Sequence, residues 1–163
     1  MRARPSGFGA GRERWWEGVA IILVSLLAFL LRIYRAQDQS VWGDELYSVM
    51  YANMGLADII RFNLRALDPQ APLFYLLLKL WVTVAGQTEL ALRMPSILGG
   101  VVLVPAVYVL GRYLVGGLAG LLAAVILAVN PFHVWYAQEV RTYSITVLLT
   151  TLSTLLFLRV LRG

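Results

Sequence analysis

The segment that decides the fold spans residues 73–85 and reads Leu-Phe-Tyr-Leu-Leu-Leu-Lys-Leu-Trp-Val-Thr-Val-Ala. Pro72 suits the first turn of a helix and Gly86 suits its end. A helix of about 14 residues extends only about 21 Å, which is short of a ~30 Å hydrocarbon core. Lys79 in its middle would cost about 2.5–3.5 kcal/mol at the centre of a bilayer. We therefore expect this helix to lie in the membrane interface or to re-enter it, and not to cross.

The composition is that of a membrane protein. Apolar residues make up 60% of the chain and charged residues 14%, with a mean hydropathy of +0.73, whereas soluble domains are about one half apolar and about one quarter charged. The chain has no cysteine, which excludes disulfides, thiolate zinc sites and a cysteine nucleophile. Part of the net charge of +5 comes from an N-terminal group of arginines, interpreted as a cytoplasmic anchor and not as a nucleic-acid site: Arg2, Arg4, Arg12 and Arg14.

The N-terminal region divides into an arm and a first span. Residues 1–14 are rich in glycine and arginine and are predicted to be a disordered cytoplasmic arm, followed by one membrane domain over residues 15–163. The apolar run from about Trp15 to Leu31 is read as a retained anchor, because the basic stretch after it has no small-residue cleavage site. We expect a plasma (inner) membrane protein and, since the chain ends directly after another apolar run, the N-terminal part of a longer one.

Three further uncharged stretches can cross a membrane, because about 17–20 residues suffice: Met94–Leu110, Tyr113–Gln138 and Thr142–Leu158. The second is longer than needed, and Asn130-Pro131 predicts that its helix ends near Val129. We then expect residues 132–138 to be aromatic interfacial chain. The fold class is an all-α membrane protein with about four transmembrane helices and membrane-parallel helices in a long first outer loop. Glycines at 99–100 and 116–120 predict close helix packing.

The sidedness of this topology depends on residues 73–85. If they do not cross, residues 32–93 form the outer segment, and the six basic residues from residue 73 onward fall three on each side. Inside lie Arg112, Arg159 and Arg162, and outside lie Lys79, Arg93 and Arg141. If they cross, the two groups exchange sides, so counting positive charges does not decide. The non-crossing topology brings Asp44 and Glu45 to the same face as the polar residues around Arg141, and we adopt it.

The pair Asp44-Glu45 stands in Ser40-Val-Trp-Gly-Asp-Glu-Leu-Tyr-Ser48, just past the first span. Ionisable groups beside a membrane span are functional hypotheses by default. Two interpretations stay open: Asp44 only starts a helix over residues 46–54, or the pair supplies a general base and a neighbour that tunes or orients it. Paired carboxylates also suit hard cations, but no third ligand has a recognisable spacing. No metal or other cofactor is therefore predicted.

A second polar cluster lies at residues 130–144, Asn-Pro-Phe-His-Val-Trp-Tyr-Ala-Gln-Glu-Val-Arg-Thr-Tyr-Ser. It is either an interfacial aromatic belt with an arginine anchor or a site for an anionic lipid head group, since arginine binds phosphate bidentately. Tyr136, Glu139 and Tyr143 are expected near one helical face. His133, the single histidine, is interpreted as interfacial packing. Residues 68–72, Asp-Pro-Gln-Ala-Pro, predict the start of a helix. Lys79 either binds phosphate or extends its ammonium group to the membrane interface.

The order of these motifs is more specific than any one of them. A basic-ended first span precedes Trp-Gly-Asp-Glu, then Asp-Pro-x-x-Pro-Leu, Glu-x-x-x-Arg-Met-Pro-Ser and Tyr-x-Gln-Glu-x-Arg-x-Tyr. The series, from about Leu31 to Arg159, resembles the N-terminal region of polytopic glycosyltransferases with the C-type fold. Within them it is similar to the protein O-mannosyltransferase-like and lipid A aminoarabinose transferase-like group. It departs at Gln70-Ala71-Pro72-Leu73, where many relatives carry His-Pro-Pro-Leu.

The resemblance implies transfer of a sugar from a polyprenyl-phosphate-linked donor to a lipid, glycan or protein hydroxyl on the outer face of the membrane. It implies that Asp44 is the catalytic base and that Glu45 binds the acceptor or positions the base. Arg32 matches an arginine that closes the first span. The residues implied near the donor pocket are Gln138, Glu139, Arg141 and Tyr143.

In such a reaction, the departing phosphate gains negative charge, which Arg141, with Arg32 or Lys79, can stabilise. One base and direct attack imply inversion at the anomeric carbon. The competing class is a non-enzymatic transporter subunit or a lipid-binding membrane scaffold, in which Asp44 only starts a helix and Arg141 only anchors the interface. The enzyme hypothesis requires Asp44 and Arg141 to meet in one cavity.

Overall fold

The computed structural model describes residues 7–38, 43–64 and 72–162. These residues form eight α-helices and no strand, which confirms the all-α class. In chain order the helices are α1 (Gly7–Ile33), α2 (Gly43–Asn53), α3 (Leu56–Leu64), α4 (Leu73–Ala85), α5 (Glu89–Leu114), α6 (Gly117–Val129), α7 (Pro131–Gln138) and α8 (Tyr143–Arg162).

Within the described ranges, three helical segments are long and apolar enough to cross a membrane: Trp15–Ile33, Glu89–Leu114 and Tyr143–Arg162. A fourth crossing is counted if α6 and α7, which meet at a bend of 58°, are taken as one broken span. Length and composition therefore agree with the prediction of about four spans.

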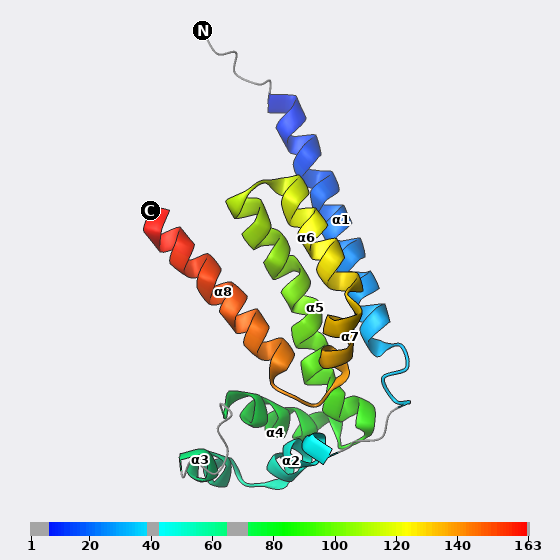
Figure 1. Cartoon of the computed structure of the whole chain (residues 1–163), viewed down its shortest axis with the longest axis vertical. Coiled ribbons are helices and arrows are strands. Elements are labelled where there is room, and N and C mark those ends of the chain that lie inside the picture. The colour runs from blue at the N-terminus through cyan, green and yellow to red at the C-terminus, as the bar shows by residue number, and fades with distance from the viewer. Residues whose placement is uncertain (1–6, 39–42, 65–71, 163) are drawn as a thin grey trace.

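The long helices form a bundle, and α2, α3 and α4 gather at one end of it (Figure 1). This is the end where α1 finishes and α5 begins, whereas the start of α1, the α5–α6 turn and the end of α8 lie toward the opposite end. Helix α4 lies across the bundle end and does not run along it. The arrangement is the one expected when residues 73–85 do not cross, and it brings α2 and the α7–α8 link to the same end.

The break after α6 has a local cause. Helix α6 ends at Val129, as predicted, and residues 131–138, of which 132–138 were predicted to be aromatic interfacial chain, form a separate helix, α7. The Asn130 side chain accepts a hydrogen bond from the His133 N–H at 3.0 Å and caps the new helix. Pro131 follows at the first helical position, where its missing N–H costs nothing. The Asn-Pro pair thus ends one helix and starts another.

Two helix boundaries differ from those predicted by counting uncharged residues. Helix α1 begins at Gly7, inside the arm predicted to be disordered, and residues 1–6 lie outside the described part of the chain. Helix α5 begins at Glu89, five residues before the predicted Met94, because Thr88 caps it through the Ala91 N–H. Arg93 does not end the hydrophobic span, since its side chain is buried against Glu45.

Glycines let the helices approach closely, as predicted. A Cβ atom added to Gly120 of α6 would lie 2.5 Å from the Tyr108 carbonyl oxygen of α5, and one added to Gly111 would lie 2.8 Å from the Gly120 Cα. A Cβ on Gly99 would lie 2.6 Å from Ile145 Cδ1 of α8. Close backbone approach of this kind is the usual basis of helix packing in membranes.

We expect Gly120→Val to destabilise the α5–α6 contact by about 1–3 kcal/mol, because the new side chain meets backbone atoms that cannot rotate away. The measurement is the free energy of unfolding in detergent micelles. Gly18→Val on α1 is the matched control, since no atom lies within 4 Å of the added Cβ there. Equal stability of the two variants would contradict the packing described for α6.

Candidate active site at the end of the bundle

Asp44 and Arg141 lie nearly a hundred residues apart in the chain and meet at the bundle end. Arg141 Nη2 lies 3.3 Å from Asp44 Oδ2, and Nη1 donates to the Asp44 main-chain carbonyl at 3.1 Å. The Asp44 side chain is 67% exposed, whereas that of Arg141 is only 12% exposed. A nearly buried cation therefore lies against an accessible carboxylate at the first turn of α2. The two side chains meet, but neither lines the pocket described below, so the cavity expected to hold both stays a prediction.

Glu45, the neighbour of Asp44, faces the opposite way. Its side chain is 2% exposed, and its Oε2 lies 3.4 Å from Arg93 Nη2 of α5. Its Oε1 accepts the Val140 N–H at 2.7 Å, and Arg93 Nη1 also donates to the Ala36 carbonyl. These contacts join α2 to α5 and to the α7–α8 link. Through these contacts Glu45 fixes the helix turn that also carries Asp44. Its own carboxylate is too buried to contact an acceptor.

The α7–α8 link, residues 139–142, carries Arg141 and is held by three side chains. Besides Glu45, Ser48 Oγ of α2 donates to the Val140 carbonyl at 2.6 Å. Ser96 Oγ of α5 donates to the Arg141 carbonyl at 3.0 Å. Both serines are buried. Sequence reasoning missed them, because single serines in apolar helices carry no signal until the tertiary structure shows which main-chain groups they bind.

Arg32 at the end of α1 binds main-chain and side-chain groups at the bend between α6 and α7. Its fully buried guanidinium donates to the carbonyls of Ala28 at 3.0 Å, Ala128 at 3.2 Å and Leu127 at 3.4 Å. The last two belong to the final turn of α6, whose carbonyls have no partner within their own helix. Nη2 also lies 2.9 Å from His133 Nδ1. These hydrogen bonds of Arg32 therefore stabilise the end of α6, and none of them involves Asp44 or Arg141.

Gln138 and Lys79 also bind main-chain carbonyls. Gln138 Nε2 donates to the carbonyls of Arg32 at 3.0 Å and Tyr34 at 2.9 Å, which joins the end of α7 to the end of α1. Lys79 Nζ of α4 donates to the Ala52 carbonyl in the last turn of α2 at 3.0 Å. Both contacts satisfy carbonyls at or beyond helix C-termini. These residues hold the elements around Asp44 in place.

Glu139 and Tyr143 flank Arg141 on the α7–α8 link and α8. Glu139 accepts the Trp135 indole N–H at 3.1 Å, and burial raises the pKa of its carboxyl. The Tyr143 ring lies 5.7 Å from the Arg141 guanidinium and meets Tyr136 edge-on at 4.9 Å. The single helical face expected for residues 136, 139 and 143 does not exist, because α7 ends at Gln138. The two tyrosines meet instead across the link.

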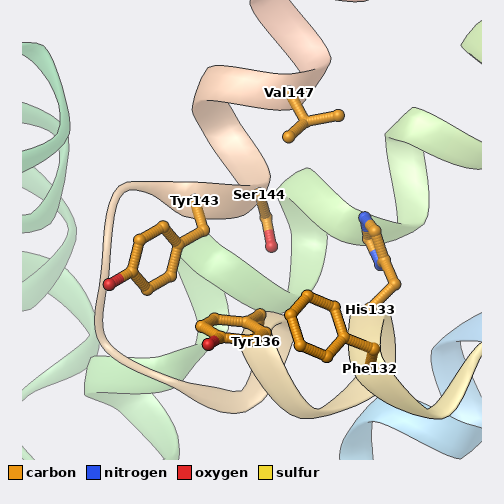
Figure 2. Close-up of a pocket in the computed structure, with 6 residues that line it drawn as sticks. All are labelled: Phe132, His133, Tyr136, Tyr143, Ser144 and Val147. Atoms are coloured by element: carbon orange, nitrogen blue, oxygen red, sulfur yellow. The ribbon is translucent and has the colours of Figure 1, made fainter.

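A pocket of about 360 Å³ opens between α7 and the start of α8. Figure 2 shows its lining side chains: Phe132, His133, Tyr136, Tyr143, Ser144 and Val147. Its walls are mainly apolar and aromatic, and its volume lies within the usual range for ligand pockets, about 300–1,000 Å³. Tyr143 belongs both to the pocket wall and to the surroundings of Arg141.

Metal binding finds no support in the described part of the chain, where no group of three or more histidine, aspartate or glutamate side chains is placed to hold an ion. Residues 40–42 and 68–71 of the sequence motifs lie outside the described residues. The chemistry available at the bundle end is therefore that of an exposed carboxylate, a guanidinium, and an adjoining aromatic pocket.

We expect Glu45→Gln to destabilise the protein by about 3–5 kcal/mol, because it leaves the buried Arg93 cation beside a neutral group. The amide oxygen can still accept the Val140 N–H, so the change tests the charge and not the shape. The measurement is the free energy of unfolding in a detergent or bilayer. Asp38→Asn, at the exposed ion pair with Arg35, is the control and should change little; a similarly small effect at Glu45 would refute its supporting role.

Comparison with known proteins places the chain in a family. The model of the family described as dolichyl-phosphate-mannose-protein mannosyltransferase matches residues 69–163, more than half of the chain. The match includes Lys79, the pocket and Arg141 and begins after Asp44 and Glu45. Neither curated proteins nor solved structures give a match. The chain belongs to the dolichyl-phosphate-mannose-protein mannosyltransferase family, a family of membrane glycosyltransferases.

Proposed function

We propose that this protein moves a sugar from a polyprenyl-phosphate-linked donor to a hydroxyl acceptor, with Asp44 as the base and Arg141 as the cation at the donor phosphate. The observation that carries the proposal is the 3.3 Å contact between an exposed carboxylate and a nearly buried guanidinium at the bundle end. Inverting transfer from a glycosyl phosphate needs an anion that accepts a proton and a cation that receives a leaving phosphate.

The reaction is a single displacement at the anomeric carbon. The acceptor oxygen forms a bond to that carbon while the bond from the carbon to the phosphate oxygen breaks. The acceptor proton passes to Asp44, and polyprenyl phosphate leaves with the electron pair of the broken bond. One displacement inverts the anomeric configuration. The acceptor can be a hydroxyl of a lipid, a glycan or a protein.

Arg141 suits the leaving phosphate because a guanidinium carries five N–H donors in a fixed plane. The contacts with Asp44 use one N–H group of each terminal nitrogen of Arg141. The guanidinium has further N–H groups that can donate to phosphate oxygens. A phosphate that arrives at Arg141 competes with Asp44 for the guanidinium. Donor binding would then free an Asp44 oxygen to receive the acceptor proton, which couples the two halves of the reaction.

The other residues of the candidate site position this pair. Glu45 holds the α7–α8 link through the Val140 N–H, and Gln138 and Lys79 hold α1 and α2 through main-chain carbonyls. Arg32 caps α6. We assign these residues to positioning and keep Tyr143, which touches the Arg141 side chain, as the contact between donor and pocket. Glu139 borders the site with its carboxylate bound by Trp135.

We further propose that the end bearing α2–α4 faces the outer side of a plasma (inner) membrane and that the N-terminus is cytoplasmic. The support is the arginine-rich arm directly before the first span, because the positive charges flanking the first helix usually dominate orientation. Arg112, Arg159 and Arg162, in the last turns of α5 and α8, lie toward the same end of the bundle as the start of α1.

We expect Asp44→Asn to lower the rate of sugar transfer at least about 100-fold, because a general base contributes about 10²–10⁴-fold. The measurement is transfer from a panel of radiolabelled polyprenyl-phosphate sugars by the protein in proteoliposomes. Asp38→Asn removes a nearby exposed carboxylate and should keep the rate. Wild-type transfer by the Asp44→Asn variant would reject Asp44 as the base, whereas the absence of transfer by the wild-type protein with every donor of the panel would favour a lipid-binding scaffold.

We expect Arg141→Ala to weaken binding of polyprenyl phosphate about 10–100-fold, since hydrogen bonds to charged groups contribute about 1.5–3 kcal/mol. Arg141→Lys should recover part of the affinity, because it keeps the charge but not the planar fork. Binding is measured without acceptor. An Asp44 side chain that has lost its partner then has no acceptor proton to receive, and it does not affect the result. Arg35→Ala is the exposed control, and an unchanged dissociation constant for Arg141→Ala would remove that residue from the donor site.

A further inference from the structure

Helix α7 presents two different faces at the bundle end. Phe132, His133 and Tyr136 line the pocket between α7 and α8 (Figure 2). Trp135 is not part of that lining, and its side chain is 49% exposed. The Trp135 indole N–H donates to Glu139 Oε1 at 3.1 Å, four residues further along the chain. The second face of α7 therefore consists of an accessible indole and the carboxylate that orients it.

A protein group satisfies the indole N–H of Trp135. In an interfacial aromatic belt, the polar end of a tryptophan is turned to lipid head groups and water. Here the N–H is bound to Glu139 instead, so the ring has a fixed orientation before any ligand arrives. An aromatic surface that is already ordered loses little side-chain freedom when it binds. The arrangement thus favours a binding surface over a membrane anchor.

Glu139 keeps one carboxylate oxygen for a ligand. Its Oε1 accepts the Trp135 N–H, and in the described part of the chain no group donates to its Oε2. The side chain is half-buried, and burial, together with the negative charges of Glu45 and Asp44, raises the pKa of its carboxyl. Carboxylate oxygens accept strong hydrogen bonds from hydroxyl groups. Glu139 therefore offers a hydroxyl-binding oxygen in the neighbourhood of Asp44.

An indole beside a carboxylate suits a sugar ring better than an anion or a hydrocarbon chain. A pyranose has C–H groups on its faces, which can lie against an indole, and hydroxyls at its edge, which can donate to a carboxylate. An anionic ligand would be repelled by the charges of Glu139 and Asp44. Hydrocarbon would cover the Glu139 Oε2 without giving it a donor. A neutral ligand rich in hydroxyls is the class that satisfies both groups.

We propose that Trp135 and Glu139 form a subsite for a sugar ring of the acceptor, so that the acceptor is a glycan. The surface is accessible on both sides of the reaction centre, since Trp135 is 49% exposed and the Asp44 side chain is 67% exposed. A glycan that arrives from water reaches an exposed surface, whereas a lipid-linked donor arrives from the bilayer. The proposal rests on the proposed function for the roles of Asp44 and Arg141.

The first test is sugar binding, because it requires no transfer. Protein in lipid nanodiscs is titrated with trisaccharides of mannose, glucose and galactose, and binding is followed by saturation-transfer nuclear magnetic resonance. We expect the wild-type protein to bind at least one of them, and Trp135→Leu and Glu139→Ala to weaken that binding at least about tenfold. Trp135→Phe should recover part of the affinity, because it keeps an aromatic face. Trp16→Leu, at a 41% exposed tryptophan near the start of the first span, is the matched control and should bind normally.

The second test separates acceptor from donor. In proteoliposomes, Trp135→Leu and Glu139→Ala should raise the KM for the trisaccharide at least about tenfold and leave the KM for the polyprenyl-phosphate sugar unchanged. Both variants should also bind polyprenyl phosphate as the wild-type protein does, which shows that they are folded. Loss of a tryptophan that only anchors α7 in the membrane interface would not affect one KM and spare the other.

The outcomes distinguish this subsite from the proposed function. Failure of every trisaccharide to bind, or equal binding by Trp135→Leu and the wild-type protein, would overturn the subsite. A higher KM for the donor in place of the trisaccharide would assign the sugar ring to the donor and also overturn it. Transfer to a serine peptide or a lipid hydroxyl that ignores Trp135 would reject a glycan acceptor and leave the proposed function standing. Trisaccharide binding that depends on Trp135, in protein whose transfer does not depend on Asp44, would support the sugar site and reject the catalytic assignment.

Discussion

The candidate site depends on one buried carboxylate. Glu45 binds Arg93 of α5 through one oxygen and the Val140 N–H through the other. It thereby fastens α2 to the bundle and fixes the link that carries Arg141. Both charged side chains are almost completely buried, and ions in such surroundings are tolerated only when they are paired and hydrogen-bonded. This pair, together with Ser48 and Ser96, therefore holds Arg141 beside Asp44.

Adjacent carboxylates at the start of one helix perform different tasks because helical geometry points them in different directions. Asp44 stays exposed and meets the guanidinium, while Glu45 turns into the protein. The other buried polar side chains follow a similar logic. Arg32, Lys79 and Gln138 reach main-chain carbonyls at or beyond helix ends, which in a membrane protein must be satisfied internally. Their charge and polarity suggested ligand binding, which stays a prediction, and the hydrogen bonds that they form here join neighbouring helices.

Residue patterns predicted several features correctly, for reasons that are local. Apolar length predicted about four spans, Asn130-Pro131 predicted the end of a helix near Val129, and the length of residues 73–85 with Lys79 predicted a helix that lies across the bundle end. The meeting of Asp44 with Arg141 was also expected, since the non-crossing topology brings both to one side. The helix over residues 131–138 was missed, because the same Asn-Pro pair that ends one helix also caps the next.

What the sequence alone determined is the membrane class, the helical segments, and the two short stretches that contain the charged residues of the site. These follow from hydropathy, helix length and helix-capping chemistry, which act between neighbours in the chain. Only the tertiary structure decided which charges pair, that Ser48 and Ser96 hold the Arg141 link, and that Arg32 reaches His133. Those contacts join residues about 45 to 100 positions apart, and a side chain's burial and partners there depend on how helices pack, which no local pattern encodes.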